Sequence, residues 1–145
     1  MTDNKSMNND NAGYVRMSGS NDRSDYSLAA AFRNAGSGIA YTFKTQRNIR
    51  VDAIFAAIVV VLGIVFRINA AEWACIFVCI GTVMGFEIMN TAVESVVDLV
   101  SPDYHILAKH AKDCAAGAVY VVAIASVFVA AFIFLPRLVS IAGIA

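Results

Sequence analysis

The amino-acid sequence predicts an all-α membrane protein, with three transmembrane helices and an amphipathic helix that lies on the membrane surface ahead of them. Hydrophobic residues make up 59% of the 145-residue chain, well above the roughly 45–50% of a typical soluble domain. Three long apolar segments follow one another, and so short a chain leaves too little polar sequence to cover them. A stripe of apolar residues at helical spacing precedes the first of these segments.

The N-terminal part of the chain divides into two segments of different composition. Residues 1–25 are rich in Asn, Ser and Asp, so we expect a disordered cytoplasmic head with almost nothing to bury. Residues 26–47 follow as a helix that is too weakly apolar to span a bilayer, and we expect it on the inner membrane surface. An ordinary solvent-exposed helix packed on the others is the alternative. Its apolar stripe consists of Leu28, Ala31, Phe32, Ala35, Ile39 and Phe43.

The three predicted spans cover about residues 51–70, 73–99 and 114–135. A span needs about 20 residues to cross a hydrocarbon core about 30 Å thick. The third segment meets that length alone, and the first does so if Arg67 extends its charged end to the interface. The second needs part of its acidic half at membrane depth or at the interface. Together with the surface helix, the spans form one domain over residues 26–138, and residues 139–145 form a short tail.

The distribution of basic residues predicts the orientation of the chain. Lys44, Arg47 and Arg50 precede the first span, and Lys109 and Lys112 precede the third. Because Lys and Arg concentrate in cytoplasmic loops, the N-terminus and residues 101–113 should be cytoplasmic. Lys plus Arg and Asp plus Glu both number 11, so that the net charge is zero and gives no indication of a nucleic-acid partner. We expect none.

The segment GFEIMNTAVESVVDLV, residues 85–100, carries acidic side chains in a helix that otherwise has the composition of a membrane span. At 100° per residue, four polar side chains fall on one face within about 80°: Glu87, Asn90, Glu94 and Asp98. Acidic groups in or near a bilayer are costly, so they normally face protein or water and mark a functional site. We therefore predict that this face turns away from lipid.

Chemistry alone leaves three roles open for this acidic face. Neighbouring carboxylates repel one another unless a cation or a shared proton lies between them. Mg²⁺ is typically held by one or two carboxylates together with substrate phosphates, and a carboxylate two turns away could then serve as a general base. The same stripe also suits a path for protons or cations. A purely structural role, with Glu94 paired to Lys112 or Arg50, is the third possibility.

The segment SPDYHILAKHAKD, residues 101–113, places basic side chains directly after this face. Its Ser-Pro start predicts that the preceding helix ends after Val100. Lys109 and Lys112 next to an acidic face suit an anionic polyphosphate, although they also fit residues that only fix topology. The sequence contains no P-loop motif and no G-x-G-x-x-G motif, so that a kinase with this sequence belongs to neither of those classes.

The segment EIMNTAVESVVDLV closely resembles the signature helix of a family of small prokaryotic lipid kinases, the diacylglycerol kinases and undecaprenol kinases, whose pattern is E-x-x-N-[ST]-A-[IV]-E-x-[VA]-[VI]-D. The resemblance extends to FKTQRNIR at 43–50, AKD at 111–113 and AAGAV at 115–119, and covers about residues 27–136. The stretches HILAKHAKDCAAGAV and FLP (134–136) are more similar to the undecaprenol type.

This resemblance implies a homotrimeric, multi-pass enzyme in the inner (cytoplasmic) membrane of a bacterium, with its active site on the cytoplasmic side. It implies transfer of the γ-phosphate of ATP to a lipid alcohol with Mg²⁺ as cofactor, and it favours undecaprenol over diacylglycerol. The expected partners are therefore the lipid, ATP, the membrane and further copies of the chain.

The resemblance also assigns roles to matching residues. Glu87 matches the catalytic base, Asn90 the polar residue that orients the site, and Glu94 a carboxylate that binds Mg²⁺ with the ATP phosphates. Asn48 and Arg50, with Glu87, match positions near the lipid substrate. The positions that match the nucleotide site are Glu94, Asp98, Asp103, Tyr104, His105, Lys112 and Asp113.

One position departs from the family pattern. Better-known members carry a second metal-binding glutamate just before the first span, and Gln46 occupies that position here. An amide oxygen can ligate Mg²⁺ but contributes no charge, so Gln46 is either a weaker ligand or is replaced by water. Two alternatives to an active lipid kinase therefore remain at this stage: a catalytically impaired family member, and a small oligomeric ion or metal transporter that uses the acidic stripe.

Overall fold

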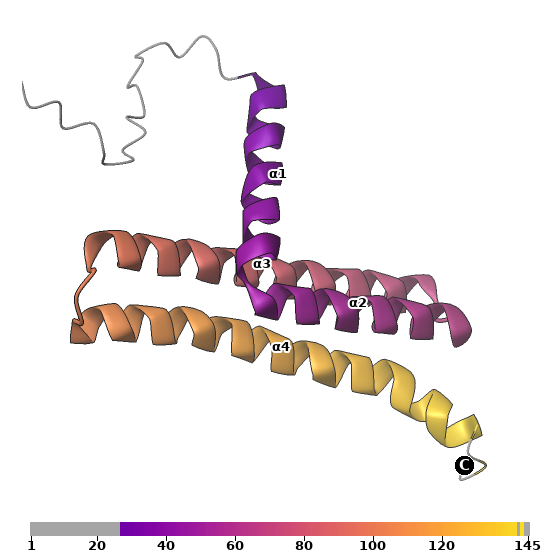
Figure 1. The fold of residues 1–145 in the computed structure, drawn as a ribbon. Helices are drawn as coiled ribbons and strands as arrows, with labels where there is room; N and C mark the ends of the chain where they lie inside the picture. Colours follow the sequence, from indigo (N-terminus) through magenta and orange to yellow (C-terminus); the bar gives the residue numbers. More distant parts are fainter. Residues whose placement is uncertain (1–26, 142, 144–145) are drawn as a thin grey trace, which may run out of the picture.

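The computed structural model describes residues 27–141 and 143, and the chain forms four helices within them (Figure 1). They are α1 (Leu28–Thr45), α2 (Arg47–Val65), α3 (Ala70–Val100) and α4 (Ile106–Ile141). This described part contains no strand, which confirms the all-α class. The predicted disordered head and Tyr26, the first residue of the predicted surface helix, lie outside the described residues.

Helices α2, α3 and α4 lie side by side, and each is long and apolar enough to cross a membrane. Large apolar side chains such as Phe128 and Phe132 are 62% and 82% exposed on the outside of this bundle, where lipid can solvate them. At 1.5 Å per residue, the 31 residues of α3 and the 36 of α4 exceed the hydrocarbon core of about 30 Å. Both long helices therefore extend beyond the start of α2. Residues 101–105 connect them there, and this end of the bundle is called the loop end.

Helix α1 projects steeply away from the bundle (Figure 1) and is joined to α2 through a single extended residue, Gln46. It contacts α2 and α3 through its C-terminal turn, where Thr42 is buried. Its apolar stripe is uncovered by the described residues, since Leu28 and Phe32 are 79% and 77% exposed. The alternative of a helix packed along the others is therefore wrong for the single chain, and the membrane-surface position stays a prediction.

Residues 66–69 connect α2 to α3 at the opposite end of the bundle, here called the turn end. The side chain of Asn69 accepts a hydrogen bond from the backbone N–H of Glu72, and the Glu72 carboxylate accepts one from the backbone N–H of Asn69. This reciprocal capping box satisfies two backbone donors at the start of α3. The helix start is thus fixed by local sequence.

The main apolar core of the chain lies at the turn end. Gly63 is required there, because a Cβ atom on this residue would lie 2.8 Å from the Trp73 ring. The Phe66 and Phe134 rings also meet at this end, with centroids 6.0 Å apart. This core, called the turn-end cluster, has four buried members, Ile68, Ile76, Ile133 and Phe134, with partly buried neighbours that include Val59, Phe66, Trp73, Ile80 and Ala130.

The third span predicted from the sequence ends at about residue 135, just before Pro136, but α4 continues through this proline to Ile141. Proline lacks an N–H, so the helix loses one hydrogen bond there, and α4 curves near its end (Figure 1). The Arg137 side chain donates to the Ile133 carbonyl oxygen and to both carboxylate oxygens of Glu72, the latter two at 3.0 and 2.7 Å. The arginine thereby ties the segment after the proline to the start of α3.

We expect Arg137→Met to lower the melting temperature of the detergent-solubilised protein by several degrees, because it removes the charged hydrogen bonds from Arg137 Nη2 to both Glu72 carboxylate oxygens, which close the turn end. Any activity of the acidic face should be unaffected well below that temperature, since this pair lies at the far end of α3 from that face. Arg67→Met is the matched control, as Arg67 is an exposed arginine at the same end of the bundle. Equal melting temperatures for the two variants would contradict this role for Arg137.

Candidate active site

The acidic face of α3 turns toward the interior of the chain. Glu87, Asn90 and Thr91 are only 4%, 7% and 3% exposed, whereas Met89 and Val96 on the opposite face are 64% and 58% exposed. A helix with buried polar and exposed apolar side chains is the inverse of a soluble surface helix. The predicted orientation of this face away from lipid is therefore confirmed for Glu87 and Asn90.

Glu94 is held by two amide groups from different parts of the chain. The Nε2 atom of Gln46 donates to Glu94 Oε2 at 3.1 Å, and the Nδ2 atom of Asn90 donates to Glu94 Oε1 at 3.1 Å. The first of these bonds fixes the α1–α2 junction at the level of Glu94. A glutamate at position 46 would instead place two like charges together, whereas the neutral amide of Gln46 can donate to the carboxylate.

These residues fit a site for Mg²⁺. The Oδ1 atom of Asn90 is buried and has no hydrogen-bond partner among the described residues, which leaves an acceptor free to take a donor or a cation. The side chain of Glu94 adds one carboxylate, and rotation of the Gln46 amide would offer a further oxygen. Within residues 27–141 and 143, no group of three His, Cys, Asp or Glu side chains could hold an ion unaided. A donor set this sparse matches Mg²⁺ that is bound mainly through substrate phosphates.

Asp52 is a site residue that the sequence analysis missed. Its carboxyl group lies beside the Glu87 carboxyl group, and the two side chains line a cavity of about 310 Å³ together with Asn48 and Asn90. The signal was present in the sequence, because Asp52 is an acid at the very start of an apolar span. Only the packing of α2 on α3 brings it against Glu87.

The residues predicted near the nucleotide gather around a second, polar cavity of about 460 Å³ at the loop end. Lys112 forms an ion pair with Asp98, and Lys109 forms one with Asp113. Of the predicted nucleotide-site residues, Glu94 lies outside this cavity, about one turn of α3 before it. The members that line it are Asp98, Asp103, Tyr104, His105, Lys112 and Asp113.

The structure does not bring every predicted site residue together. Arg50 is exposed and lines neither the Glu87 cavity nor the loop-end cavity. The structural pairing of Glu94 with Lys112 or Arg50 is also wrong. Lys112 pairs with Asp98, and Glu94 is bound by amides.

Comparison with known proteins identifies the class to which this fold and site belong. Residues 33–134 match the family described as prokaryotic diacylglycerol kinase. The chain is 44% identical over 108 residues to an undecaprenol kinase of Bacillus subtilis, which covers 74% of this chain and 88% of that protein. It is also 44% identical over 115 residues to a diacylglycerol kinase of Synechocystis, over 79% of this chain and 66% of that protein. A diacylglycerol kinase of Escherichia coli K12 is 28% identical over 90 residues, which are 62% of this chain and 74% of that protein.

The three apolar helices and these matches define a multi-pass membrane protein of the lipid kinase class. The chain belongs to the prokaryotic diacylglycerol kinase family. The matched region begins in α1 and ends at the turn-end cluster, so that it contains the acidic face, Gln46, Asp52 and the loop-end cavity.

Proposed function

We propose that the chain transfers the γ-phosphate of ATP to the hydroxyl group of a membrane lipid alcohol, with Mg²⁺ as cofactor. The observation that carries this proposal is the line of polar sites along one face of α3. The carboxyl pair of Asp52 and Glu87 is followed by Glu94, about 10 Å further along the axis, and by Asp98, about 6 Å beyond that. A lipid hydroxyl and a water-soluble polyphosphate can therefore approach the same face from opposite ends.

The side chains on this face divide the reaction between them. Glu87 accepts the proton of the lipid hydroxyl as the hydroxyl oxygen attacks the γ-phosphorus, and the bond from that phosphorus to the β-phosphate oxygen breaks so that ADP leaves. Asp52, which lines the same cavity as Glu87, can take that proton in turn. Asn90 spans the two halves, since it lines the Glu87 cavity and donates to Glu94. Glu94, with the amide oxygens of Gln46 and Asn90 in reach, would hold Mg²⁺, which would supply positive charge to neutralise the phosphates. Lys112 and Lys109 at the loop-end cavity bind the nucleotide.

The proposed lipid is undecaprenol in preference to diacylglycerol. The two relatives with these names are equally identical to the chain, but the alignment spans 88% of the undecaprenol kinase and 66% of the diacylglycerol kinase. The stretches HILAKHAKDCAAGAV and FLP also resemble the undecaprenol type. A competition between the two lipids tests this preference.

We further infer a homotrimer in the cytoplasmic membrane of a bacterium, with the loop end in the cytoplasm. The positive-inside rule favours this orientation, because basic residues concentrate toward the loop end. Cβ atoms added to Gly81, Gly85 or Gly117 would meet nothing within 4 Å, which leaves room for a neighbouring helix to approach closely. The basic residues that carry the orientation are Lys44, Arg47, Arg50, Lys109 and Lys112.

A transfer assay tests the proposed activity. Purified protein is incubated with γ-labelled ATP, Mg²⁺ and either undecaprenol or diacylglycerol in mixed micelles, and labelled lipid phosphate is separated from ATP. We expect label in the lipid, with more in undecaprenol than in diacylglycerol at equal mole fraction. Label in neither lipid, from protein that melts cooperatively, would reject the kinase function and return the acidic stripe to the transporter alternative.

We expect Gln46→Glu to lower the Mg²⁺ concentration for half-maximal transfer by about tenfold, because a second carboxylate adds roughly 1.4 kcal/mol of attraction for the cation. Without Mg²⁺ the same variant should melt below the wild type, since it loses the amide donor to Glu94 and gains a like charge beside it. Thr45→Glu is the matched control, as it adds the same charge one residue earlier at an exposed position. An unchanged Mg²⁺ dependence would show that position 46 is not near the metal.

A further inference from the structure

Arg47 is the one basic side chain among the described residues that line the Glu87 cavity. It is the first residue of α2 and is exposed, so that it lies at the mouth of the cavity. Asn48, beside it on α2, and Tyr120 from α4 line the same cavity, and Tyr120 is 69% exposed. The mouth therefore carries a cation and two neutral hydrogen-bond donors, whereas the interior carries the carboxyl groups of Asp52 and Glu87.

The charge of Arg47 is not balanced within the part of the chain that the structure describes. The three ion pairs there all involve other residues. The first turn of α2 contains no acidic residue, and the dipole of a helix disfavours a positive charge at its N-terminus. Arg47 is therefore a cost to the single chain, and its N–H donors are available to an anion.

Membrane topology alone does not explain this position. The positive-inside rule accounts equally for Lys44, Arg47 and Arg50, since all three precede the first span. Lys44 and Arg50 line neither the Glu87 cavity nor the loop-end cavity. The placement of a positive charge beside the carboxyl groups is thus particular to Arg47.

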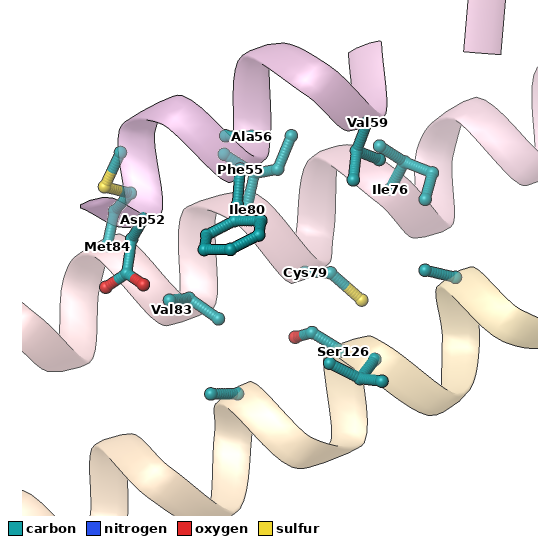
Figure 2. A pocket seen from close by; sticks show the side chains of 13 residues that line it. Asp52, Phe55, Ala56, Val59, Ile76, Cys79, Ile80, Val83, Met84 and Ser126 are labelled. Atoms are coloured by element: carbon teal, nitrogen blue, oxygen red, sulfur yellow. The ribbon is translucent and has the colours of Figure 1, made fainter. Parts of the chain in front are cut away.

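The spaces on either side of the Glu87 cavity supply no second cation. Beyond Asp52, the space between α2 and α4 is an apolar groove whose walls include Phe55 and Val83 (Figure 2), and no basic residue lines it. In the other direction, the lysines of the loop-end cavity lie at the level of Asp98, which is about 16 Å from Glu87 along the axis of α3. Among the residues that line these three spaces, only Arg47 offers positive charge next to Glu87.

We propose that the Arg47 guanidinium binds the phosphoryl group beside Glu87, first as the γ-phosphate of ATP during transfer and then as the monoester phosphate of the lipid product. The inference rests on the proposed lipid kinase function. Arginine presents a planar fork of N–H donors that matches phosphate oxygens, and the charge of the transferring group is spread over three such oxygens. The carboxyl groups of Asp52 and Glu87 repel that charge when ionised, and Arg47 offsets the repulsion. No proton leaves Arg47 in this step.

Substitution of Arg47 tests its role in transfer. In Arg47→Gln we expect kcat to fall about 10²–10³-fold, the usual loss when a donor to developing negative charge is removed. The KM for the lipid alcohol should stay within about twofold, because the alcohol carries no phosphate. Arg47→Lys keeps the charge without the fork, and its kcat should lie between those of the wild type and Arg47→Gln. Lys44→Gln is the matched control, since it removes the same charge at an exposed position nearby, and it should leave kcat unchanged.

A binding measurement without ATP tests the product phosphate separately. The melting temperature of the detergent-solubilised protein is followed at increasing concentrations of farnesyl phosphate, a short prenyl phosphate monoester, and of farnesol, the corresponding alcohol. A ligand that binds only the folded state raises the melting temperature. We expect farnesyl phosphate to stabilise the wild type and Lys44→Gln more than farnesol does, and to stabilise Arg47→Gln no more than farnesol does. Inorganic phosphate and phosphatidylglycerol, a phosphate diester, should give smaller rises than farnesyl phosphate.

The outcomes separate this inference from the proposed function. If farnesyl phosphate stabilises the protein only when Arg47 is present, but the wild type transfers phosphate to no lipid, the phosphate site is supported and the kinase function is rejected. A wild-type kcat in Arg47→Gln would reject the role of Arg47 and leave the kinase function intact. Equal stabilisation by phosphatidylglycerol or inorganic phosphate would overturn the assignment to a lipid monoester. If Arg47→Gln without ligand melts well below Lys44→Gln and keeps its kcat, Arg47 serves folding or a contact between copies of the chain, and the proposal is wrong.

Discussion

Glu87→Gln is expected to reduce lipid phosphorylation about 10²–10⁴-fold, the usual contribution of a general base. The amide has nearly the shape of the carboxyl group but cannot accept the proton of the attacking hydroxyl. Because Glu87 is 4% exposed and lies against Asp52, an uncharged isostere at this position should fold at least as well as the wild type. Transfer of label from γ-labelled ATP to undecaprenol under saturating lipid gives the decrease in kcat directly.

Two further variants separate the role of the base from the general effect of changing an acid. Asp52→Asn should reduce transfer less than Glu87→Gln, since Asp52 acts on the proton only after Glu87 has taken it. Glu72→Gln removes a carboxylate from the far end of the same helix and should leave kcat unchanged at temperatures below its melting transition. Full activity in Glu87→Gln would refute its assignment as the base.

Helical periodicity was sufficient to predict the acidic face. Glu87, Asn90 and Glu94 lie on one side of α3 because their spacing follows the helix repeat, and the cost of burying acids in lipid turns that side inward. The end of α3 at Val100 also follows from local sequence, through Pro102 two residues later. Local rules of this kind fix a helix and its faces without knowledge of its neighbours.

The contacts between helices could not be predicted in the same way. Asp52 meets Glu87 only because α2 packs on α3 at one particular height, which the bond between Gln46 and Glu94 fixes. No periodicity within either helix encodes this height. Lys112 likewise pairs with Asp98 rather than Glu94 because the length of the loop before α4 sets how the two long helices align.

The continuation of α4 through Pro136 has a comparable tertiary cause. Proline usually ends or kinks a helix, and the third span predicted from the sequence stops at about residue 135, just before this proline. The residues after it remain helical in contact with α3, where Arg137 reaches Glu72 at 2.7 Å. An ion pair between residues 65 positions apart can therefore override a local signal.

Glu94→Gln is expected to reduce transfer about 100-fold or more at a fixed Mg²⁺ concentration, because the site then lacks its one carboxylate and several kcal/mol of charge stabilisation. The reduction should shrink as Mg²⁺ is raised, since the amide oxygens of Gln46 and Asn90 remain near the ion. The fold should change little, because an amide at position 94 can still accept from one of its two present donors. Mg²⁺ titrations of the labelled transfer reaction measure both the loss and its partial recovery.

Exchanging the two side chains gives the sharpest form of this test. In the double variant Gln46→Glu, Glu94→Gln, the carboxylate moves across the hydrogen bond that now joins Gln46 Nε2 to Glu94 Oε2 at 3.1 Å, and the net charge and the bond are both preserved. If the two residues flank one Mg²⁺ ion, the double variant should be about tenfold more active than the single variant Glu94→Gln. If the double variant is no more active than Glu94→Gln, Glu94 acts at a place that a carboxylate at position 46 cannot reach. Gln46 then only holds the Glu94 side chain in place.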